Sequence, residues 1–168
     1  MANTYEAIAT VTVGSGGAAD IDFTSIPATY TDVVLKISCR GSDTTVYTSM
    51  TISLNGSSSS FTGRIIEGSG SSVASGTPTT GIGDPNGNGS TANTFGNVEI
   101  YIPNYAGSTN KSISVDGVGE NNATEAYAYF VATLRSNTAA INQITISPTA
   151  TKTWLQYTSA TLYGIKNS

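Results

Sequence analysis

The residue types that catalysis most often needs are missing from this sequence. It contains no histidine and a single cysteine, Cys39, so neither a Ser-His-Asp triad nor a Cys-His pair can form, and a zinc site built from histidines or several thiolates is excluded too. Eleven acidic residues leave a carboxylate pair of the glycosidase type formally open, but their spacing along the chain pairs none of them. The sequence therefore predicts that the protein is not an enzyme and carries no cofactor.

The sharpest local motif that could bind a ligand runs from Asp84 to Gly89. Its residues Asp84, Asn86 and Asn88 place side-chain oxygens at alternate positions, and a glycine stands sixth, as in the first half of a calcium loop. The twelfth position of such a loop is a bidentate glutamate, and here it is Phe95. A turn-rich loop explains the same residues, and this interpretation is preferred to a calcium site.

Aromatic residues are the other candidates for binding. Tyrosine dominates them, with nine residues against four Phe and one Trp. Such rings can stack on sugars or bury area against another protein, and Trp154, Tyr157 and Tyr105 are the candidates for glycan or protein contact. The alternative is that they pack within the sheets, because aromatic residues favour strands in any case.

Charged residues are few and form no basic cluster. Seven Lys and Arg stand against eleven Asp and Glu, which gives a net charge of -4. Nucleic-acid binding needs clustered basic residues, so no direct binding to DNA or RNA is expected. Cys39 has no partner for an intrachain disulfide, and it falls in the apolar phase of a predicted strand, so it is expected to be buried.

The elements that must position these residues are predicted to be strands. Apolar and polar residues alternate over 33–40 and again over 46–54, after which Asn55-Gly56 indicates a tight turn. No apolar period of 3.6 residues persists, so no helix is expected. Further strands are predicted at 5–13, 18–23, 61–67, 98–102, 112–118, 126–135, 143–147 and 154–165, with a break near Ser159 left open in the last.

About nine or ten strands with polar connections predict an all-β fold. We expect one domain over residues 1–168, an antiparallel, jelly-roll-like β-sandwich. Residues 68–93 are rich in Gly and Ser and are predicted to form one long loop that projects from the domain. The N-terminus lacks the basic and apolar regions of a signal peptide, and no stretch is long enough to span a bilayer.

The surface that this composition implies is polar but nearly uncharged. Only 11% of the residues are charged, against a usual share of roughly a quarter, and Ser, Thr, Asn and Gly supply the polar groups. Such surfaces are common outside cells, yet no export signal is present. Assembly in a host cytoplasm and release by lysis, as for a phage particle, would reconcile the two observations, and so would export through another signal.

Several stretches resemble small virion structural proteins of tailed bacteriophages. They are Phe23–Asp32 with the strand that follows it, Thr91–Lys111, Glu120–Tyr127 and Ser159–Ile165. The resemblance implies a jelly-roll-like part of the virion without catalytic motifs. It favours a capsid decoration (cement) or head-fibre subunit that binds other virion proteins, such as the major capsid protein, and forms a homo-oligomer such as a trimer.

Two other functions stay open at this point. A receptor-binding module of a tail fibre or baseplate would recognise host surface glycans through Trp154, Tyr157 and the 68–93 loop, because jelly rolls present loops and sheet faces to ligands. A non-viral carbohydrate-binding or adhesion domain is the more distant alternative.

Overall fold

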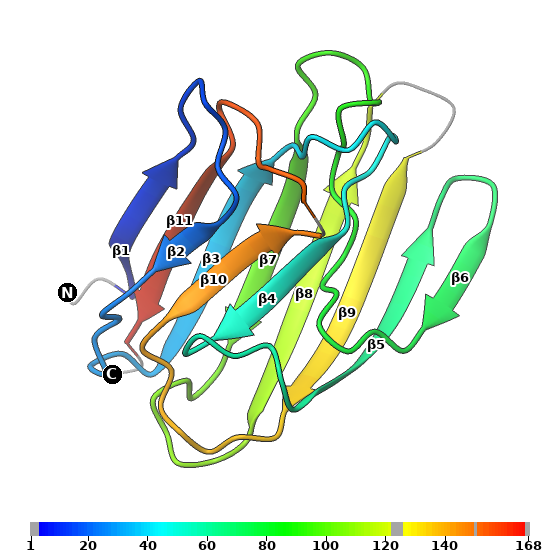
Figure 1. Ribbon diagram of the computed structural model, residues 1–168. Helices are drawn as coiled ribbons and strands as arrows, with labels where there is room; N and C mark the ends of the chain where they lie inside the picture. The colour runs from blue at the N-terminus through cyan, green and yellow to red at the C-terminus, as the bar shows by residue number, and fades with distance from the viewer. Residues whose placement is uncertain (1–3, 122–125, 150, 167–168) are drawn as a thin grey trace.

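Every regular element in the described part of the protein is a β-strand. The computed structural model describes residues 4–121, 126–149 and 151–166 (Figure 1). None of these residues belongs to a helix that could cross a membrane. The strands are β1 (Tyr5–Thr12), β2 (Ile21–Phe23), β3 (Asp32–Cys39), β4 (Met50–Leu54), β5 (Phe61–Gly68), β6 (Val73–Gly76), β7 (Gly96–Ile102), β8 (Lys111–Gly119), β9 (Tyr127–Arg135), β10 (Ile144–Pro148) and β11 (Ser159–Ile165).

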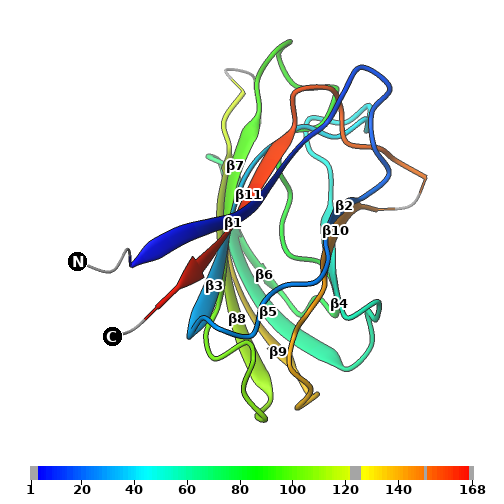
Figure 2. The ribbon, with the colours of Figure 1, turned by 90° about the vertical axis from the view of Figure 1, so that its left-hand side faces the viewer.

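The strands form two antiparallel sheets of unequal size, which confirms the predicted β-sandwich. Eight strands make the large sheet, in the order β1-β11-β3-β7-β8-β9-β5-β6, and three make the small sheet, in the order β2-β10-β4. Figure 2 shows the small sheet lying over one face of the large sheet. The large sheet therefore has an inner face, toward the small sheet, and an outer face turned away from it.

Strands that come early in the chain pair with strands that come late. β1 and β3 flank β11 in the large sheet, while β2 and β4 flank β10 in the small sheet. The jelly-roll-like character of the sandwich stays a prediction. Two strand pairs, β5–β6 and β8–β9, are additional to this nested pairing and widen the large sheet beyond β7.

The core lies between the sheets and takes one side-chain phase from each strand. In β8, Ile113 and Val115 are buried, whereas Ser112 and Asp116 are exposed. Period-2 alternation places successive side chains on opposite faces, which is why the sequence revealed these strands. Cys39 is fully buried in this core, as predicted, and burial raises the pKa of its thiol far above the ordinary value.

Residues 68–93 do not form one projecting loop, so that prediction is wrong. The segment contains β6, and its second half returns along the small sheet: the Ile82 N–H donates to the Met50 carbonyl (2.8 Å), and the Met50 N–H donates to the Gly83 carbonyl (2.9 Å). Ile82 is fully buried. Gly83 has a φ of 121°, and a Cβ there would lie 1.9 Å from the Tyr129 ring. One buried isoleucine and one glycine thus anchor a segment whose composition is typical of a linker.

Several strand boundaries differ from the predicted ranges, by three or more residues at the starts of β2, β4 and β11. β4 begins at Met50 and not at residue 46, because the preceding residues pair with the 85–89 backbone: the Thr48 N–H donates to the Pro85 carbonyl (2.7 Å). β11 begins at Ser159, which confirms the break in 154–165. Residues 122–125 of the stretch 120–127 lie outside the described residues.

Candidate binding surfaces

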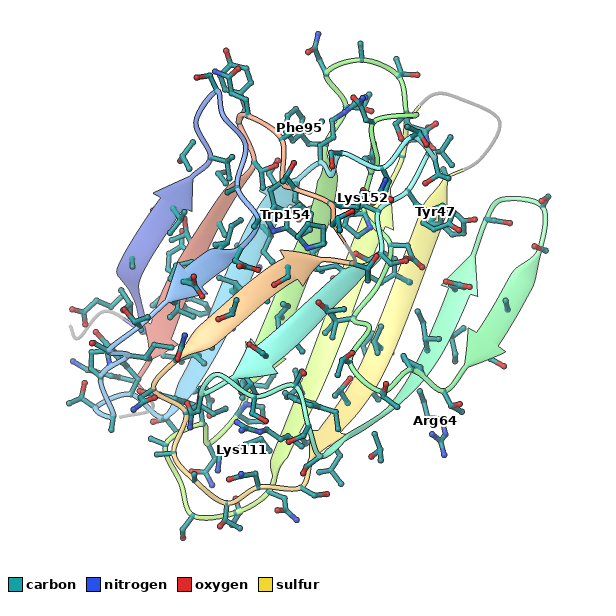
Figure 3. The ribbon with its side chains drawn as sticks, in the orientation of Figure 1. Tyr47, Arg64, Phe95, Lys111, Lys152 and Trp154 are labelled. Atoms are coloured by element: carbon teal, nitrogen blue, oxygen red, sulfur yellow. The ribbon has the colours of Figure 1, made fainter. Side chains whose placement is uncertain are left out.

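Two of the three aromatic residues predicted to make external contacts are buried, so the prediction is wrong for them. Trp154 is 0% exposed; its indole N–H donates to the Ile146 carbonyl (3.1 Å), and its backbone pairs with Ala18 (Figure 3). Tyr105 is also fully buried, and its hydroxyl donates to the Pro27 carbonyl. Burial raises the pKa of Tyr105. Both rings pack within the sandwich, as the alternative interpretation expected.

Tyr157 is the predicted contact residue that stays at the surface, with 69% of its area exposed. Its φ is 73°, in the left-handed region that bulky residues rarely adopt. The Tyr157 N–H donates to the Val13 carbonyl (3.0 Å), and the next N–H, that of Thr158, donates to the Leu155 carbonyl (3.1 Å). Such a backbone costs on the order of 1–3 kcal/mol and persists where its surroundings hold it, often at functional sites.

Tyr157 lines a hollow of about 400 Å³ at one end of the sandwich. Three connections meet there, those between β1 and β2, β6 and β7, and β10 and β11, which lie together at the upper end in Figure 1. Figure 3 shows Phe95 at this end and Lys111 at the opposite end. We call this hollow the loop-end pocket, and its lining includes Gly17, Asn88, Asn93, Phe95, Gln156 and Tyr157.

A buried arginine fastens one wall of the loop-end pocket. Arg40 follows β3 directly and is only 6% exposed. Burial lowers the pKa of its guanidinium. Its N–H groups donate to the carbonyls of Thr91 (2.6 Å), Thr94 (3.0 Å), Asn88 (3.2 Å) and Ser90 (2.9 Å). One side chain therefore satisfies four carbonyls of a connection that forms neither helix nor strand.

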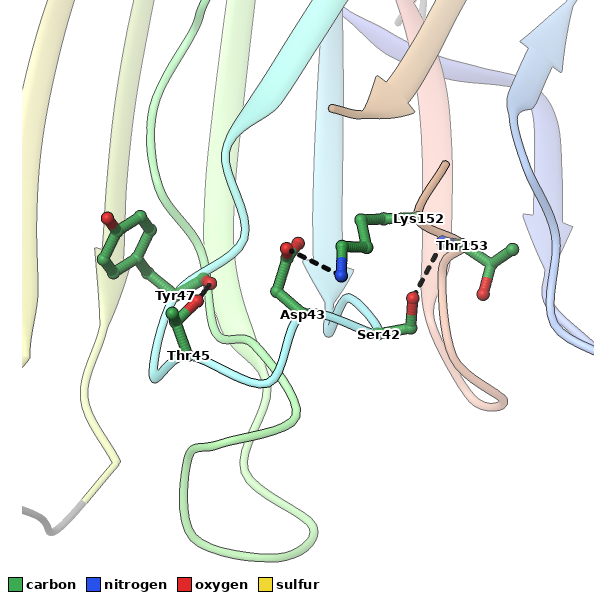
Figure 4. A network of polar contacts seen from close by, with 6 residues as sticks. All are labelled: Ser42, Asp43, Thr45, Tyr47, Lys152 and Thr153. Atoms are coloured by element: carbon green, nitrogen blue, oxygen red, sulfur yellow. Dashed lines mark hydrogen bonds and ion pairs between the residues drawn. The ribbon is translucent and has the colours of Figure 1, made fainter. Parts of the chain in front are cut away.

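A second polar network ties the β10–β11 connection to the β3–β4 connection (Figure 4). The Ser42 hydroxyl accepts the Thr153 N–H (3.0 Å), and the Ser42 N–H donates to the Thr153 carbonyl (2.9 Å). Lys152 Nζ lies 3.6 Å from Asp43 Oδ1. Because the loops around the pocket are joined to one another as well as to the strands, they form a preorganised rim.

The three residues of the calcium motif are not brought to one point. Asp84 Oδ1 accepts the Ser49 hydroxyl (2.6 Å), while the Asn86 amide donates to Thr94 Oγ1 (2.9 Å). Asn88 lines the loop-end pocket, whereas Asp84 lines a different hollow. Across the described residues no group of three or more acidic or cysteine side chains could hold a metal. The separate positions of Asp84 and Asn88 favour the interpretation of the motif as a structured turn.

Two carboxylates do share a site that the sequence spacing did not reveal. Glu67 and Asp84 line a hollow of about 410 Å³ together with Ser49. Burial raises the pKa of both carboxyl groups, and the negative charge of Asp84 raises the pKa of Glu67 further. The Ser49 hydrogen bond acts in the opposite direction on Asp84 but does not reverse the shift. That the protein is not an enzyme remains a prediction, and this pair is the place to test it.

The raised pKa values predict how stability depends on pH. A carboxyl group whose pKa is higher in the folded than in the unfolded state contributes stability as the pH falls through the folded pKa, and this contribution is absent above it. Asp84→Asn should therefore raise the free energy of unfolding at pH 7 and flatten its pH dependence above about pH 4, the ordinary pKa of an aspartate. The amide oxygen can still accept the Ser49 hydroxyl, so this hydrogen bond is kept. Urea unfolding at several pH values measures this, with exposed Asp116→Asn as the control; an unchanged slope for Asp84→Asn would contradict it.

The outer face of the large sheet carries the main group of exposed apolar side chains. Phe130 is 53% exposed and pairs with Ile66, which is 61% exposed. The strand register places the other members on the same face, on β6, β8 and β9. We call this group the outer patch, and it comprises Ile66, Val73, Val118, Phe130 and Leu134. Parts of it surround a shallow hollow of about 420 Å³.

The sequence of β9 indicates the outer patch, although the search for alternating apolar and polar residues does not detect it. Both side-chain phases of β9 are apolar: Tyr129 and Val131 face the core, while Ala128, Phe130 and Ala132 face outward. A strand that is apolar on both faces is typical of a sheet covered on both sides. Because the small sheet covers only the inner face, the outer face of β9 has no cover within the described part of the chain (Figure 2).

The fold and these surfaces define the chain as an all-β sandwich with one apolar face and one end built from joined loops. In comparisons with known proteins, no family model, no curated protein and no solved structure matches it.

Proposed function

We propose that the protein is a structural subunit of a bacteriophage particle, of the capsid decoration or head-fibre type, and that it works by burying the outer patch against a second copy of itself. The outer patch is the observation that carries this proposal. Monomeric proteins seldom expose large contiguous apolar groups, and such groups mark surfaces that assemble. The resemblance of the sequence to virion proteins and its nearly uncharged composition support the placement in a phage particle.

A second copy fits the outer patch better than a strongly charged partner does. The same face carries one basic residue, Arg64, and one acidic residue, Asp116, on the strands that flank β9. Two copies can therefore meet without net repulsion between like charges. Contact through the same patch on both copies also produces a closed assembly. Each copy covers the patch of the other, so no patch remains to bind a further copy.

The oligomeric state in solution tests this assembly. Wild-type protein should have twice the mass of the 17.2 kDa chain by light scattering, because a surface that pairs with itself closes as a dimer. The trimer that the resemblance suggests would instead require contact between two different patches, and a trimer would contradict the proposed contact. Ile66→Ser with Phe130→Ser should weaken association by about 100-fold or more, because burial of each large apolar side chain contributes roughly 1.5–3 kcal/mol. Tyr157→Asn is a matched control, since it removes an exposed ring outside the patch. A wild-type monomer at millimolar concentration would contradict the proposed contact.

The place of the protein in a particle needs a separate measurement. Quantitative mass spectrometry of purified phage particles should find the chain in many copies, as decoration and head-fibre subunits require. A handful of copies would favour a tail location, and its absence from purified particles would contradict the viral part of the proposal while leaving the oligomeric state untouched.

A further inference from the structure

The loop-end pocket has features of a ligand site that the outer patch does not share. Its rim is fixed by Arg40 and by the two hydrogen bonds between Ser42 and Thr153, of which Figure 4 draws the one to the Ser42 hydroxyl. Two of its lining residues, Asn93 and Tyr157, have left-handed φ values of 64° and 73°. Asparagine tolerates this region, but a tyrosine does so rarely. The connection between β10 and β11 therefore holds the Tyr157 ring outward at the edge of the pocket.

Three side-chain amides of the loop-end pocket are free to bind a ligand. Asn88, Asn93 and Gln156 are exposed, and in the described part of the chain their side chains have no hydrogen-bond partner. Each amide offers both a donor and an acceptor. A ligand hydroxyl both donates and accepts hydrogen bonds, so an amide with its donor and its acceptor can pair with both functions of the hydroxyl.

The charges around the loop-end pocket argue against an ionic ligand. No Asp, Glu or Lys side chain lines it. Arg40 does line it, but its terminal N–H groups already donate to loop carbonyls. Tyr157 and Phe95 add two aromatic rings, whose faces can cover an apolar ring face. Aromatic rings beside uncommitted amides, without a carboxylate or a free cation, match a molecule with many hydroxyls and no charge.

We propose that the loop-end pocket binds a neutral saccharide, with Tyr157 stacking on a sugar ring and with Asn88, Asn93 and Gln156 hydrogen-bonding its hydroxyls. This inference goes beyond the assembly role and does not depend on it, because the pocket and the outer patch share no residue. It also differs from the glycan site expected from the sequence, in which Trp154 was a contact residue. Here Trp154 only supports the connection that carries Tyr157.

A glycan array tests the inference, followed by saturation-transfer difference NMR with methyl glycosides of glucose, galactose, mannose and N-acetylglucosamine. Wild-type protein should bind at least one neutral glycan and show saturation of its ring protons. Tyr157→Asn and Gln156→Ala should each weaken binding by tenfold or more. Asparagine suits a left-handed φ, so Tyr157→Asn should keep the fold, which circular dichroism verifies. Ser112→Ala, exposed on β8 and outside both the outer patch and the loop-end pocket, should bind like the wild type.

Three results would overturn the inference. One is a wild-type protein that binds no neutral glycan on the array. Another is binding confined to sialylated or sulfated glycans, which would mean that charge and not hydroxyl recognition governs the site. The third is equal binding by wild type, Tyr157→Asn and Gln156→Ala, which would place any glycan site elsewhere on the protein.

Discussion

Trp154→Ala is expected to lower the free energy of unfolding by about 3–5 kcal/mol, the range for removing a large buried aromatic side chain. The ring is fully buried between the sheets, and its removal leaves both a cavity and an Ile146 carbonyl without its donor. The backbone of Trp154 also pairs with Ala18 through two hydrogen bonds, of 2.7 and 3.0 Å. The loss of the ring should therefore loosen two connections at once.

Chemical denaturation followed by far-UV circular dichroism measures this effect, because the variant lacks the only tryptophan and so its fluorescence. Trp154→Phe is the informative control: it keeps much of the apolar volume but not the indole donor, and it should lose clearly less stability than Trp154→Ala. Tyr157→Asn should lose little. If Trp154→Ala lost less than about 1 kcal/mol, the ring would not be an anchor of the core.

Arg40→Met is the second substitution with a large expected effect. Methionine can occupy much of the apolar stem, but it donates to none of the four loop carbonyls that the guanidinium satisfies. Hydrogen bonds to a charged group contribute about 1.5–3 kcal/mol each, and a buried acceptor that loses its donor is destabilising. Because those contributions are not additive, we expect a total loss of about 3–5 kcal/mol, as for other broken buried charge contacts.

The Arg40→Met variant should also change local order in a way that a general loss of stability does not. The connection over residues 88–94 should become the first site of limited proteolysis and should lose amide protection before the sheets do. Arg64→Met is the matched control, because Arg64 is exposed on β5 and, among the described residues, donates a hydrogen bond only to the Gly63 carbonyl next to it in the chain. Equal protease sensitivity of the two variants would show that Arg40 does not fasten these residues.

The sequence predicted strands and their buried residues correctly where one face of the strand is exposed to solvent and the other is buried. The alternation around Leu35 and Ile52 depends only on neighbours in the chain, and both residues are buried as that alternation requires. Prediction from the sequence failed where burial depends on a distant partner. Trp154 becomes a core residue because Ala18 and Ile146 lie beside it, and no local pattern contains that information.

The same limit applies to the candidate sites. The loop-end pocket combines residues from three connections that are far apart in the sequence, and only Tyr157 and Asn88 had been singled out beforehand. The prediction of one projecting loop over residues 68–93 failed because Gly and Ser dominate the composition of the segment. The single buried Ile82 does not stand out in such a composition. The outer patch was not predicted either, although β9, in which both side-chain phases are apolar, carries a local signal for it.

The nested pairing of the strands has a consequence for how the protein folds. None of the first four strands pairs with another of the first four: β1 pairs only with β11, β2 and β4 pair only with β10, and β3 pairs with β7 and β11. Until β7 has been made, the strands β1 to β4 have no partner in either sheet, and β1, β2 and β4 still have none until β10 or β11 has been made. The pairings between strands that follow each other in the chain are β5–β6 and those of the β7-β8-β9 meander. Pairing over the long sequence separations of the other strand pairs makes folding slow. The strands that can pair locally also carry the outer patch. A nascent chain therefore exposes this apolar surface before β10 and β11 complete the two sheets.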